Sequence, residues 1–207
     1  MSEAPAANEA PLGRREQTKL ANRAAILHAG WRVFSTTGYD AATIRDLVRE
    51  SGLSPGTFYN YFPDKQAVFR QLVDEILGEL RPRIREARAA ATSAEGFVRD
   101  AFAVAVHSLL ADETRFALIV HSTSAFRECV FQGQQLAGIA EELRVDMERA
   151  TEAGTFPAFP AELMTAAMIG ATIEVGVLGT HMGRTPEEIA DFLGTLFLQG
   201  MLGFVGG

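Results

Sequence analysis

The sequence has few of the residues from which enzyme and metal sites are built. Its 207 residues include a single cysteine, Cys129, so no disulfide can form within the chain. His107 and His121 lie 14 positions apart, whereas paired histidine ligands on one helix lie about three to five apart. The sequence contains no Cys/His cluster, glycine-rich phosphate loop or nucleophile elbow. We therefore expect no enzymatic activity, no metal site and no cofactor; a redox role for Cys129 is the alternative to a small buried hydrophobe.

Long apolar runs are also missing. None approaches the roughly 20 residues of a membrane-spanning helix, and the N-terminus lacks a signal-peptide core. Together with the single cysteine, this favours the reducing cytoplasm. Hydrophobic residues make up 47% of the chain and charged residues 22%, which is enough apolar material for a full core. No strand-like alternation competes with helical spacing, so we expect an all-α fold.

Residues 43–65 hold the clearest local pattern. Thr43 and Asp46 have the spacing of a capping box, and apolar residues follow at helical intervals. Gly52 suits the left-handed turn that ends a helix, while Ser54 and Pro55 suit the cap and first position of the next one. Two helices joined by a glycine turn within about 20 residues are typical of a helix-turn-helix. A capped helical hairpin inside a helical core is the alternative for this stretch alone.

Charge is distributed unevenly along the chain. The net charge is -7, yet residues 14–65 contain eight Lys or Arg against five Asp or Glu, and residues 89–207 contain six against fifteen. This predicts a basic head that faces nucleic acid and an acidic body that faces away. A basic cluster opens the first helix and could contact phosphates or a minor groove, with ordinary solvated surface as the alternative. It consists of Arg14, Arg15, Lys19 and Arg23.

Residues 26–69 resemble the DNA-binding domain of the TetR (tetracycline-repressor-like) family of bacterial transcriptional regulators. The residues that carry the resemblance are Phe34, Gly38, Tyr39, Thr43, Ile44, Asp46, Leu47, Val48, Ser51, Gly52, Leu53, Ser54, Gly56, Thr57, Phe58, Tyr59, Tyr61, Phe62 and Lys65. Pro63 and Gln66 depart from the usual residues. The resemblance implies an N-terminal three-helix helix-turn-helix head and a larger C-terminal helical body for ligand binding and dimerisation.

The resemblance also implies which residues meet DNA. Thr43, Thr57, Tyr61 and Lys65 match positions that usually contact phosphates, and Tyr39 matches a position near the DNA backbone. Phosphate contacts orient the head, whereas base contacts specify the sequence. Positions that can meet base edges are matched by Arg45, Pro55, Gly56 and Asn60, and a further common contact position by Tyr59.

The predicted boundary between head and body lies near Arg81 and Pro82, because proline breaks or restarts a helix. We expect a disordered tail at 1–13, a DNA-binding domain at 14–80 and an effector-binding and dimerisation domain at 81–207. Helices of the body are predicted at 82–91, 94–111, 113–131, 134–153, 160–182 and 186–204.

The last two predicted helices are apolar on nearly every side. Such a helix is buried on every side, which six helices cannot easily arrange within one subunit. We therefore predict a homodimer through a four-helix bundle, with a monomeric core as the alternative. The residues expected at the interface are Met164, Ile169, Ile173, Phe192, Leu196, Phe197 and Met201.

Aromatic and methionine residues of the body, with few polar groups among them, are typical of an apolar ligand cavity. The residues expected to line it are Phe97, Phe102, His107, Phe116, His121, Ser124, Arg127, Met168, Thr172 and Glu174. The alternative is core packing for each Phe or Met, and a satisfied core group for His107, His121 and Glu174. The composition favours a hydrophobic effector of acyl, aromatic or drug-like type.

Together these features predict a dimeric, sequence-specific DNA-binding transcriptional regulator. We expect a repressor that a small hydrophobic effector releases from a palindromic operator in double-stranded DNA. The alternatives are a constitutive DNA-binding protein without an effector, and a helical enzyme or adaptor with a vestigial head. The predicted partners are operator DNA, a second copy of the chain and the effector, without a membrane.

Overall fold

The structure is a computed structural model that describes residues 13–110 and 112–204. Over these residues it contains helices and no strand, which confirms the predicted all-α class. The predicted tail at 1–13 lies outside the described residues except for Gly13. The helices are α1 (Arg14–Thr37), α2 (Ile44–Ser51), α3 (Pro55–Tyr59), α4 (Lys65–Ala90), α5 (Ala94–Leu110), α6 (Glu113–His121), α7 (Thr123–Gln132), α8 (Gln134–Glu152), α9 (Ala161–His181) and α10 (Pro186–Leu202).

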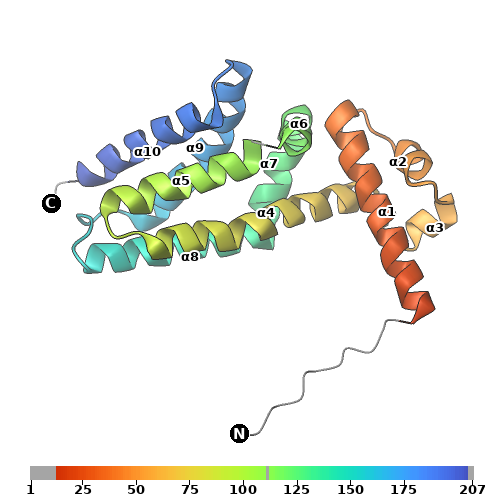
Figure 1. The fold of residues 1–207 in the computed structure, drawn as a ribbon, viewed down its shortest axis with the longest axis horizontal. Helices are drawn as coiled ribbons and strands as arrows, with labels where there is room; N and C mark the ends of the chain where they lie inside the picture. Colours follow the sequence, from red (N-terminus) through yellow and green to blue (C-terminus); the bar gives the residue numbers. More distant parts are fainter. Residues whose placement is uncertain (1–12, 111, 205–207) are drawn as a thin grey trace, which may run out of the picture.

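Helices α1, α2 and α3 form a head at one end of the molecule (Figure 1). The predicted capping box is confirmed: the Thr43 side chain accepts from the Asp46 N–H, and the Asp46 carboxylate accepts from the Thr43 N–H. Gly52 ends α2 in the left-handed region with φ 68°, and Ser54 caps α3 by accepting from the Thr57 N–H. The core that closes the head consists of the fully buried side chains Ile26, Phe34, Leu47, Phe58 and Phe69.

Helix α4 connects the head to the body without interruption. It runs through an internal Pro82, so the predicted helix break at Arg81 and Pro82 is wrong. Proline in a helix interior costs about 3 kcal/mol. Leu80 and Ile84, however, are buried on either side of it, in the same apolar cluster as residues of α5 and α8. This packing keeps both halves of α4 in line. The division between residues 80 and 81 therefore falls within a helix and stays a prediction.

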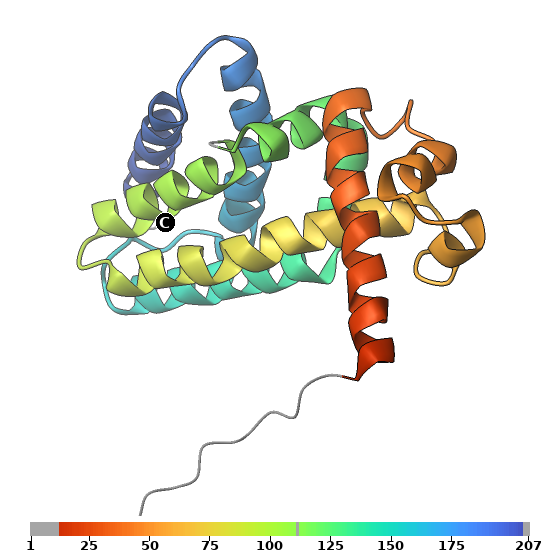
Figure 2. The same cartoon turned by 45° about the vertical axis from the view of Figure 1, so that its right-hand side comes forward.

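The body is arranged around α4. Figures 1 and 2 show α4, α5 and α8 running side by side, with α10 along α5. One buried apolar cluster extends from Phe34 in the head, along α4, to Ile173 in α9. A second cluster is formed by α5, α8, α9 and α10 around Val98, Leu193 and Met201. Because the first cluster crosses from head to body, a displacement inside the body is able to reach the head through packed side chains.

The predicted helix at 113–131 is in fact two helices. α6 ends at His121 and α7 begins at Thr123, with Ser122 between them at φ −129° and ψ 29°. Ser122 is buried, and its Oγ accepts a hydrogen bond from the Tyr39 N–H at 3.0 Å. Periodicity along 113–131 could not reveal this break, because the partner of Ser122 lies 83 residues away in the chain.

Candidate nucleic-acid interface and apolar cavity

Helix α3 presents a short exposed surface on the head. Pro55, Gly56, Tyr59 and Asn60 are exposed, while the fully buried Phe58 anchors the helix in the core. A Cβ atom added at Gly56 would meet no atom within 4 Å, so the first turn of α3 leaves space for close approach. An exposed helix start with unobstructed side chains is the geometry that reaches base edges in a major groove.

The C-terminal end of α3 lies beside the basic start of α1. Asn60 and Tyr61 line one hollow together with Arg15 and Lys19 of α1. The phenolic oxygen of Tyr61 accepts a hydrogen bond from Asn22 Nδ2 at 3.3 Å, which fixes α3 against α1. The basic first turns of α1 therefore border the same surface as α3, an arrangement that suits phosphate contact.

Helix α2 contributes an arginine with no internal partner. Arg45 is exposed and makes no ion pair or hydrogen bond with the described residues, whereas the neighbouring Arg49 donates to Asp46 at 2.8 Å. The Thr43 hydroxyl donates to the same carboxylate at 2.6 Å. The pKa of Asp46 lies below its usual value, chiefly because of this bond from the Thr43 side chain. Thr43 is thus occupied as a cap, while Arg45 is available to a base or phosphate.

Lys65 is directed into the head. Its Nζ donates to the carbonyl oxygens of Tyr39 at 2.7 Å and Ala42 at 2.9 Å, with a longer contact to that of Asp40 at 3.4 Å. The same ammonium lies 4.4 Å from the centroid of the Tyr39 ring. A lysine has three N–H donors, and here they meet three carbonyls. Lys65 therefore orders the turn before α2, and a phosphate contact would have to replace one of these bonds.

Two adjoining cavities lie inside the body. The first has a volume of about 70 Å³ and the second about 60 Å³. The first is lined by Leu77, Leu80, Ile84, Ala105, Leu109, Phe126, Val130, Leu136, Ile139, Ile169, Thr172 and Ile173. The second is lined by Ile84, Arg88, Ala101, Phe102, Ala105, Ile139, Leu143, Met168, Ile169 and Thr172. Five residues belong to both, so the two form one narrow apolar slot among α4, α5, α7, α8 and α9.

Three of the ten expected effector residues, Phe102, Met168 and Thr172, line this slot. The residues that line neither cavity are Phe97, His107, Phe116, His121, Ser124, Arg127 and Glu174. Arg127 and Glu174 instead form a half-exposed ion pair at 2.8 Å. His107 Nε2 lies 2.8 Å from Glu187 Oε1 near the surface. His107, Arg127 and Glu174 therefore have their partners near the surface and not in the slot.

Sequence reasoning missed the contribution of α4 to the slot. Leu77, Leu80, Ile84 and Arg88 line it, but the expected break at Pro82 placed these residues on two separate helices. The available signal was the spacing of Leu77, Leu80 and Ile84, which continues one helical stripe across the proline.

The head matches a known family. Residues 26–72 match the family model described as bacterial regulatory proteins, tetR family. This range contains α2, α3 and the turn between them, and therefore the whole helix-turn-helix described above. The head of the chain is therefore similar to the DNA-binding domain of tetR-family regulators.

The fold of the whole chain is shared by solved structures. A bacterial regulatory protein in the tetR family from Rhodococcus RHA1 has a TM-score of 0.69 at 20% identity, over 89% of this chain and 98% of that one. The fatty acid degradation regulator FadR from Bacillus halodurans has a TM-score of 0.71 at 21% identity, over 93% and 98%. FadR from Bacillus subtilis in complex with stearoyl-CoA has a TM-score of 0.72 at 17% identity, over 86% and 98%. At these identities the likeness concerns the fold.

In this chain the end of α1 meets the end of α6. Gly38 has φ 77° and ψ 160°, and a Cβ atom there would lie 2.4 Å from the carbonyl oxygen of His121. His121 Nδ1 is 2.6 Å from the Ser35 carbonyl oxygen, and Ser122 accepts from the Tyr39 N–H. His121, which we expected to contact an effector, therefore lies at the contact between head and body.

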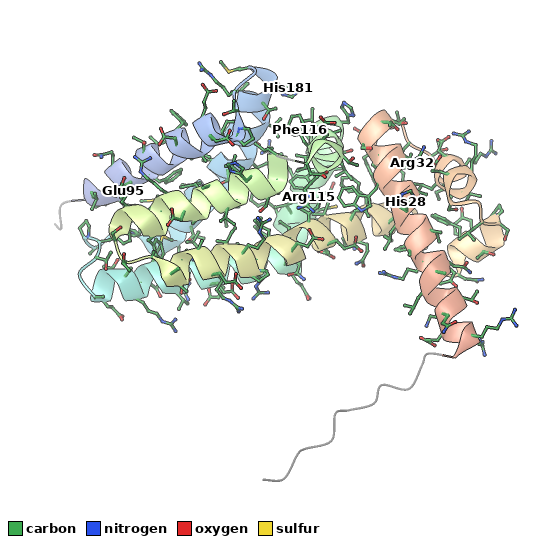
Figure 3. All side chains as sticks on the ribbon, viewed as in Figure 1. His28, Arg32, Glu95, Arg115, Phe116 and His181 are labelled. Carbon is green, nitrogen blue, oxygen red and sulfur yellow. The ribbon has the colours of Figure 1, made fainter. Side chains whose placement is uncertain are left out.

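Arg115 extends this contact to α4 and α5. Its Nη2 donates to Glu79 Oε2 of α4 at 2.7 Å, and its Nη1 donates to the Ser108 carbonyl oxygen of α5 at 2.9 Å. Figure 3 labels Arg115 between α4 and α5. Arg115 is largely buried and Glu79 exposed. Helix α6 is therefore held to α1, α4 and α5 at once, and it supplies no described residue to the slot itself.

Helices α9 and α10 expose large apolar side chains, which we call the apolar face. It comprises Leu163 and Leu178 of α9, Met182 at the C-cap of α9, and Phe192 and Leu196 of α10, with exposures of 70, 60, 66, 56 and 51%. In the described part of the chain α9 alone is long and apolar enough to cross a membrane, with mean hydropathy 1.5, so the expectation that no apolar run approaches that length is wrong for α9. Core helices of soluble proteins also pass this test. Monomeric soluble proteins rarely leave a large apolar surface uncovered.

Two of the seven expected interface residues, Phe192 and Leu196, belong to this apolar face. Met201 is fully buried within the subunit, and Phe197 stacks on Phe102 with ring centroids 5.3 Å apart. The others pack around the slot or the second apolar cluster: Met164, Ile169 and Ile173. Composition alone could not separate the inner from the outer sides of helices that are apolar all round.

Proposed function

We propose that this tetR-family regulator is a homodimeric repressor that a small hydrophobic effector releases from a palindromic operator. In the cytoplasm, the two heads would contact successive major grooves of the operator, with α3 and Arg45 reaching base edges. Effector binding would favour a body conformation in which the spacing of the heads no longer fits the operator. A coupling free energy of about 1–3 kcal/mol is sufficient for such a response.

The continuity of α4 carries this proposal. The helix begins in the head, where Lys65 bonds the turn before α2 and Phe69 is fully buried. It continues into the body, where Leu77, Leu80 and Ile84 line the slot. A ligand that separates the walls of the slot would therefore displace the same helix that supports α2 and α3. Helices transmit such displacements as nearly rigid elements.

The slot supports an apolar effector that opens its own site. Pockets for drug-sized ligands have volumes of roughly 300–1,000 Å³, whereas the two cavities measure about 70 and 60 Å³. An effector of that size would have to move α8 or α9 away from α4. One protein of similar fold was solved in complex with stearoyl-CoA, which is consistent with a long apolar ligand here.

The apolar face supports dimerisation. Its side chains belong to α9, to the C-cap of α9 and to α10. Figure 1 shows α9 and α10 on the side of the body away from α2 and α3. A two-fold axis through this face would therefore leave both heads free to reach DNA. A symmetric dimer matches a palindromic operator, because each half-site meets one copy of the same head.

DNA-binding measurements test the proposal directly. Fluorescence anisotropy with a labelled fragment of the DNA upstream of the chain's own coding region should show saturable binding at physiological salt. A scrambled duplex of the same composition should bind much more weakly. Addition of metabolites that raise the melting temperature of the protein should then release the DNA.

Each alternative gives a different result. Specific binding that no stabilising ligand reverses would support a constitutive DNA-binding protein. Absence of specific binding to any genomic fragment would contradict the regulator and leave a helical enzyme or adaptor. Ligand at a hundred times its dissociation constant stabilises a protein by about 2.7 kcal/mol, so thermal denaturation is sensitive enough for the ligand search.

A further inference from the structure

The slot contains one charged side chain, and that side chain is almost completely buried. Arg88 of α4 lines the second cavity, and its side chain is 2% exposed. Its Nε donates to Asp146 Oδ2 of α8 at 2.9 Å. Its Nη1 is buried and has no hydrogen-bond partner among the described residues. An unpaired buried donor destabilises a protein, and a charged one does so more strongly, so this atom is suited to an acceptor from outside the chain.

Charge around Arg88 also favours a negative ligand. Arg81, Arg85 and Arg88 of α4 act on Glu142 of α8 and lower its pKa, with the Arg81 hydrogen bond as the main cause. Glu142 and Asp146 are the two carboxylates that pair with this row of three arginines. The third arginine, Arg85, is exposed and lines neither cavity, so it adds positive potential near the slot, while the hydrogen-bond donor inside the slot is Arg88.

The rest of the slot is suited to an apolar tail. The walls near Arg88 are formed by Phe102, Leu143 and Met168, and the further cavity continues toward Leu77. The remaining polar side chain is Thr172, whose hydroxyl already donates to the Met168 carbonyl oxygen at 2.8 Å. A charged group at one end and hydrocarbon walls elsewhere match a molecule with one acidic end and an apolar chain.

We propose that the effector is an amphipathic carboxylic acid whose carboxylate accepts a hydrogen bond from Nη1 of Arg88. Its hydrocarbon chain extends along α4 toward Leu77 and the head. This assignment rests on the proposed function, since it names the chemical class of the effector for the same slot. Arginine pairs with carboxylates through short charge-assisted hydrogen bonds, so the acid end also fixes the direction of the chain in the slot.

Three probes that share an unbranched ten-carbon chain test the carboxylate: decanoate, methyl decanoate and 1-decanol. The measurement is isothermal titration of the full-length protein at pH 7.5, which lies roughly three units above the pKa of a carboxylic acid, so decanoate is ionised. Decanoate should bind at least about tenfold more tightly than the two neutral probes. Arg88→Met should weaken decanoate binding by about ten- to a hundredfold and abolish the preference for the acid. Equal affinity for all three probes in the wild-type protein would overturn the carboxylate assignment.

Arg81→Met is the matched control. It also removes an ion pair between α4 and α8, at 2.7 Å to Glu142, but Arg81 lines neither cavity. It should keep the preference for decanoate. If Arg88→Met does not fold, Arg88→Lys retains the charge without the planar fork and should bind decanoate with intermediate affinity. Loss of the preference in Arg81→Met as well would show a structural effect and contradict the assignment.

The DNA assay separates this proposal from the proposed function. If decanoate binds in an Arg88-dependent manner but never releases specifically bound DNA, the carboxylate site stands and the ligand-controlled repressor fails. If another, neutral ligand releases the DNA while decanoate does not bind, the repressor stands and the carboxylate site fails.

Discussion

Single side chains in the head divide into those that contact the protein and those that remain available to DNA. Lys65 belongs to the first group because its ammonium bonds the carbonyl oxygens of Tyr39 and Ala42. Family resemblance assigned it a phosphate. The geometry adds a role that sequence could not reveal, because the partners of Lys65 lie 26 and 23 residues away. The sequence could therefore indicate that Lys65 matters, whereas the partners of its side chain became known only from the fold.

We expect Lys65→Met to loosen the turn before α2. The variant loses charge-assisted hydrogen bonds, which contribute about 1.5–3 kcal/mol when made to charged groups. Thermal or urea denaturation should therefore show lower stability, and DNA affinity should fall for specific and random sequences alike. A direct phosphate contact would reduce the slope of log affinity against log salt by about 1. An unchanged slope with lower affinity would assign Lys65 to positioning alone.

Arg45→Ala tests the side chain of α2 that has no internal partner. If Arg45 contacts a base edge, the variant should lose about 1–3 kcal/mol of affinity for the preferred operator, with a smaller loss on random DNA. Arg49→Ala is the matched control on the same helix, since Arg49 pairs with Asp46 at 2.8 Å. Competition anisotropy with both duplexes measures the difference. Equal losses for the two variants would contradict a special role for Arg45.

Helix starts were predictable from the sequence because capping is local. Thr43, Ser54, Asp64 and Thr185 each accept a hydrogen bond from a backbone N–H three residues later. The errors came where distant packing outweighed a local signal. Pro82 predicted a break in α4, but buried residues on both sides of it keep the helix continuous. The break at Ser122 had no local signal, because it is stabilised by a hydrogen bond from the distant Tyr39 N–H.

Pro82→Ala should stabilise the protein. Pro82 is exposed and cannot donate to the Gly78 carbonyl, so alanine restores a hydrogen bond without disturbing the core. The expected gain is up to about 3 kcal/mol in the free energy of unfolding. Pro63→Ala is the control, because Pro63 is exposed in the segment before α4 and should give no gain. A loss of stability in Pro82→Ala would indicate that the backbone of α4 is interrupted at this position.

Gly38→Ala should weaken the contact between α1 and α6. The backbone of Gly38 has φ 77° and ψ 160°, and the added Cβ atom would approach the His121 carbonyl oxygen to 2.4 Å. A non-glycine residue in this region costs about 1–3 kcal/mol from strain alone, and the steric overlap adds to that cost. Gly52→Ala also has positive φ but meets no atom within 4 Å. Urea denaturation should therefore show the larger loss for Gly38→Ala.

At the scale of the whole molecule, the sequence predicted the presence of a cavity and of an apolar surface better than their locations. Phe102, Met168 and Thr172 line the slot because they lie on the core-facing sides of apolar helices, and their contact with an effector stays a prediction. Arg88 was not foreseen, since an arginine side chain that is only 2% exposed depends on α8 supplying Asp146. The exposed side of α9 could not be predicted either, because a helix that is apolar on all sides does not indicate which side packs against its neighbours.

The apolar face gives the last prediction. Leu178→Glu places a charge where a second copy is expected to pack, so analytical ultracentrifugation should show a monomer in place of a dimer. Phe131→Glu is the control, since Phe131 of α7 is similarly exposed at 56% but lies outside the apolar face. If dimerisation brings two heads to one operator, Leu178→Glu should lose most specific affinity while its helical content and melting transition persist. A dimer that survives Leu178→Glu would contradict this interface. A monomer that still binds the operator at wild-type affinity would contradict the need for two heads.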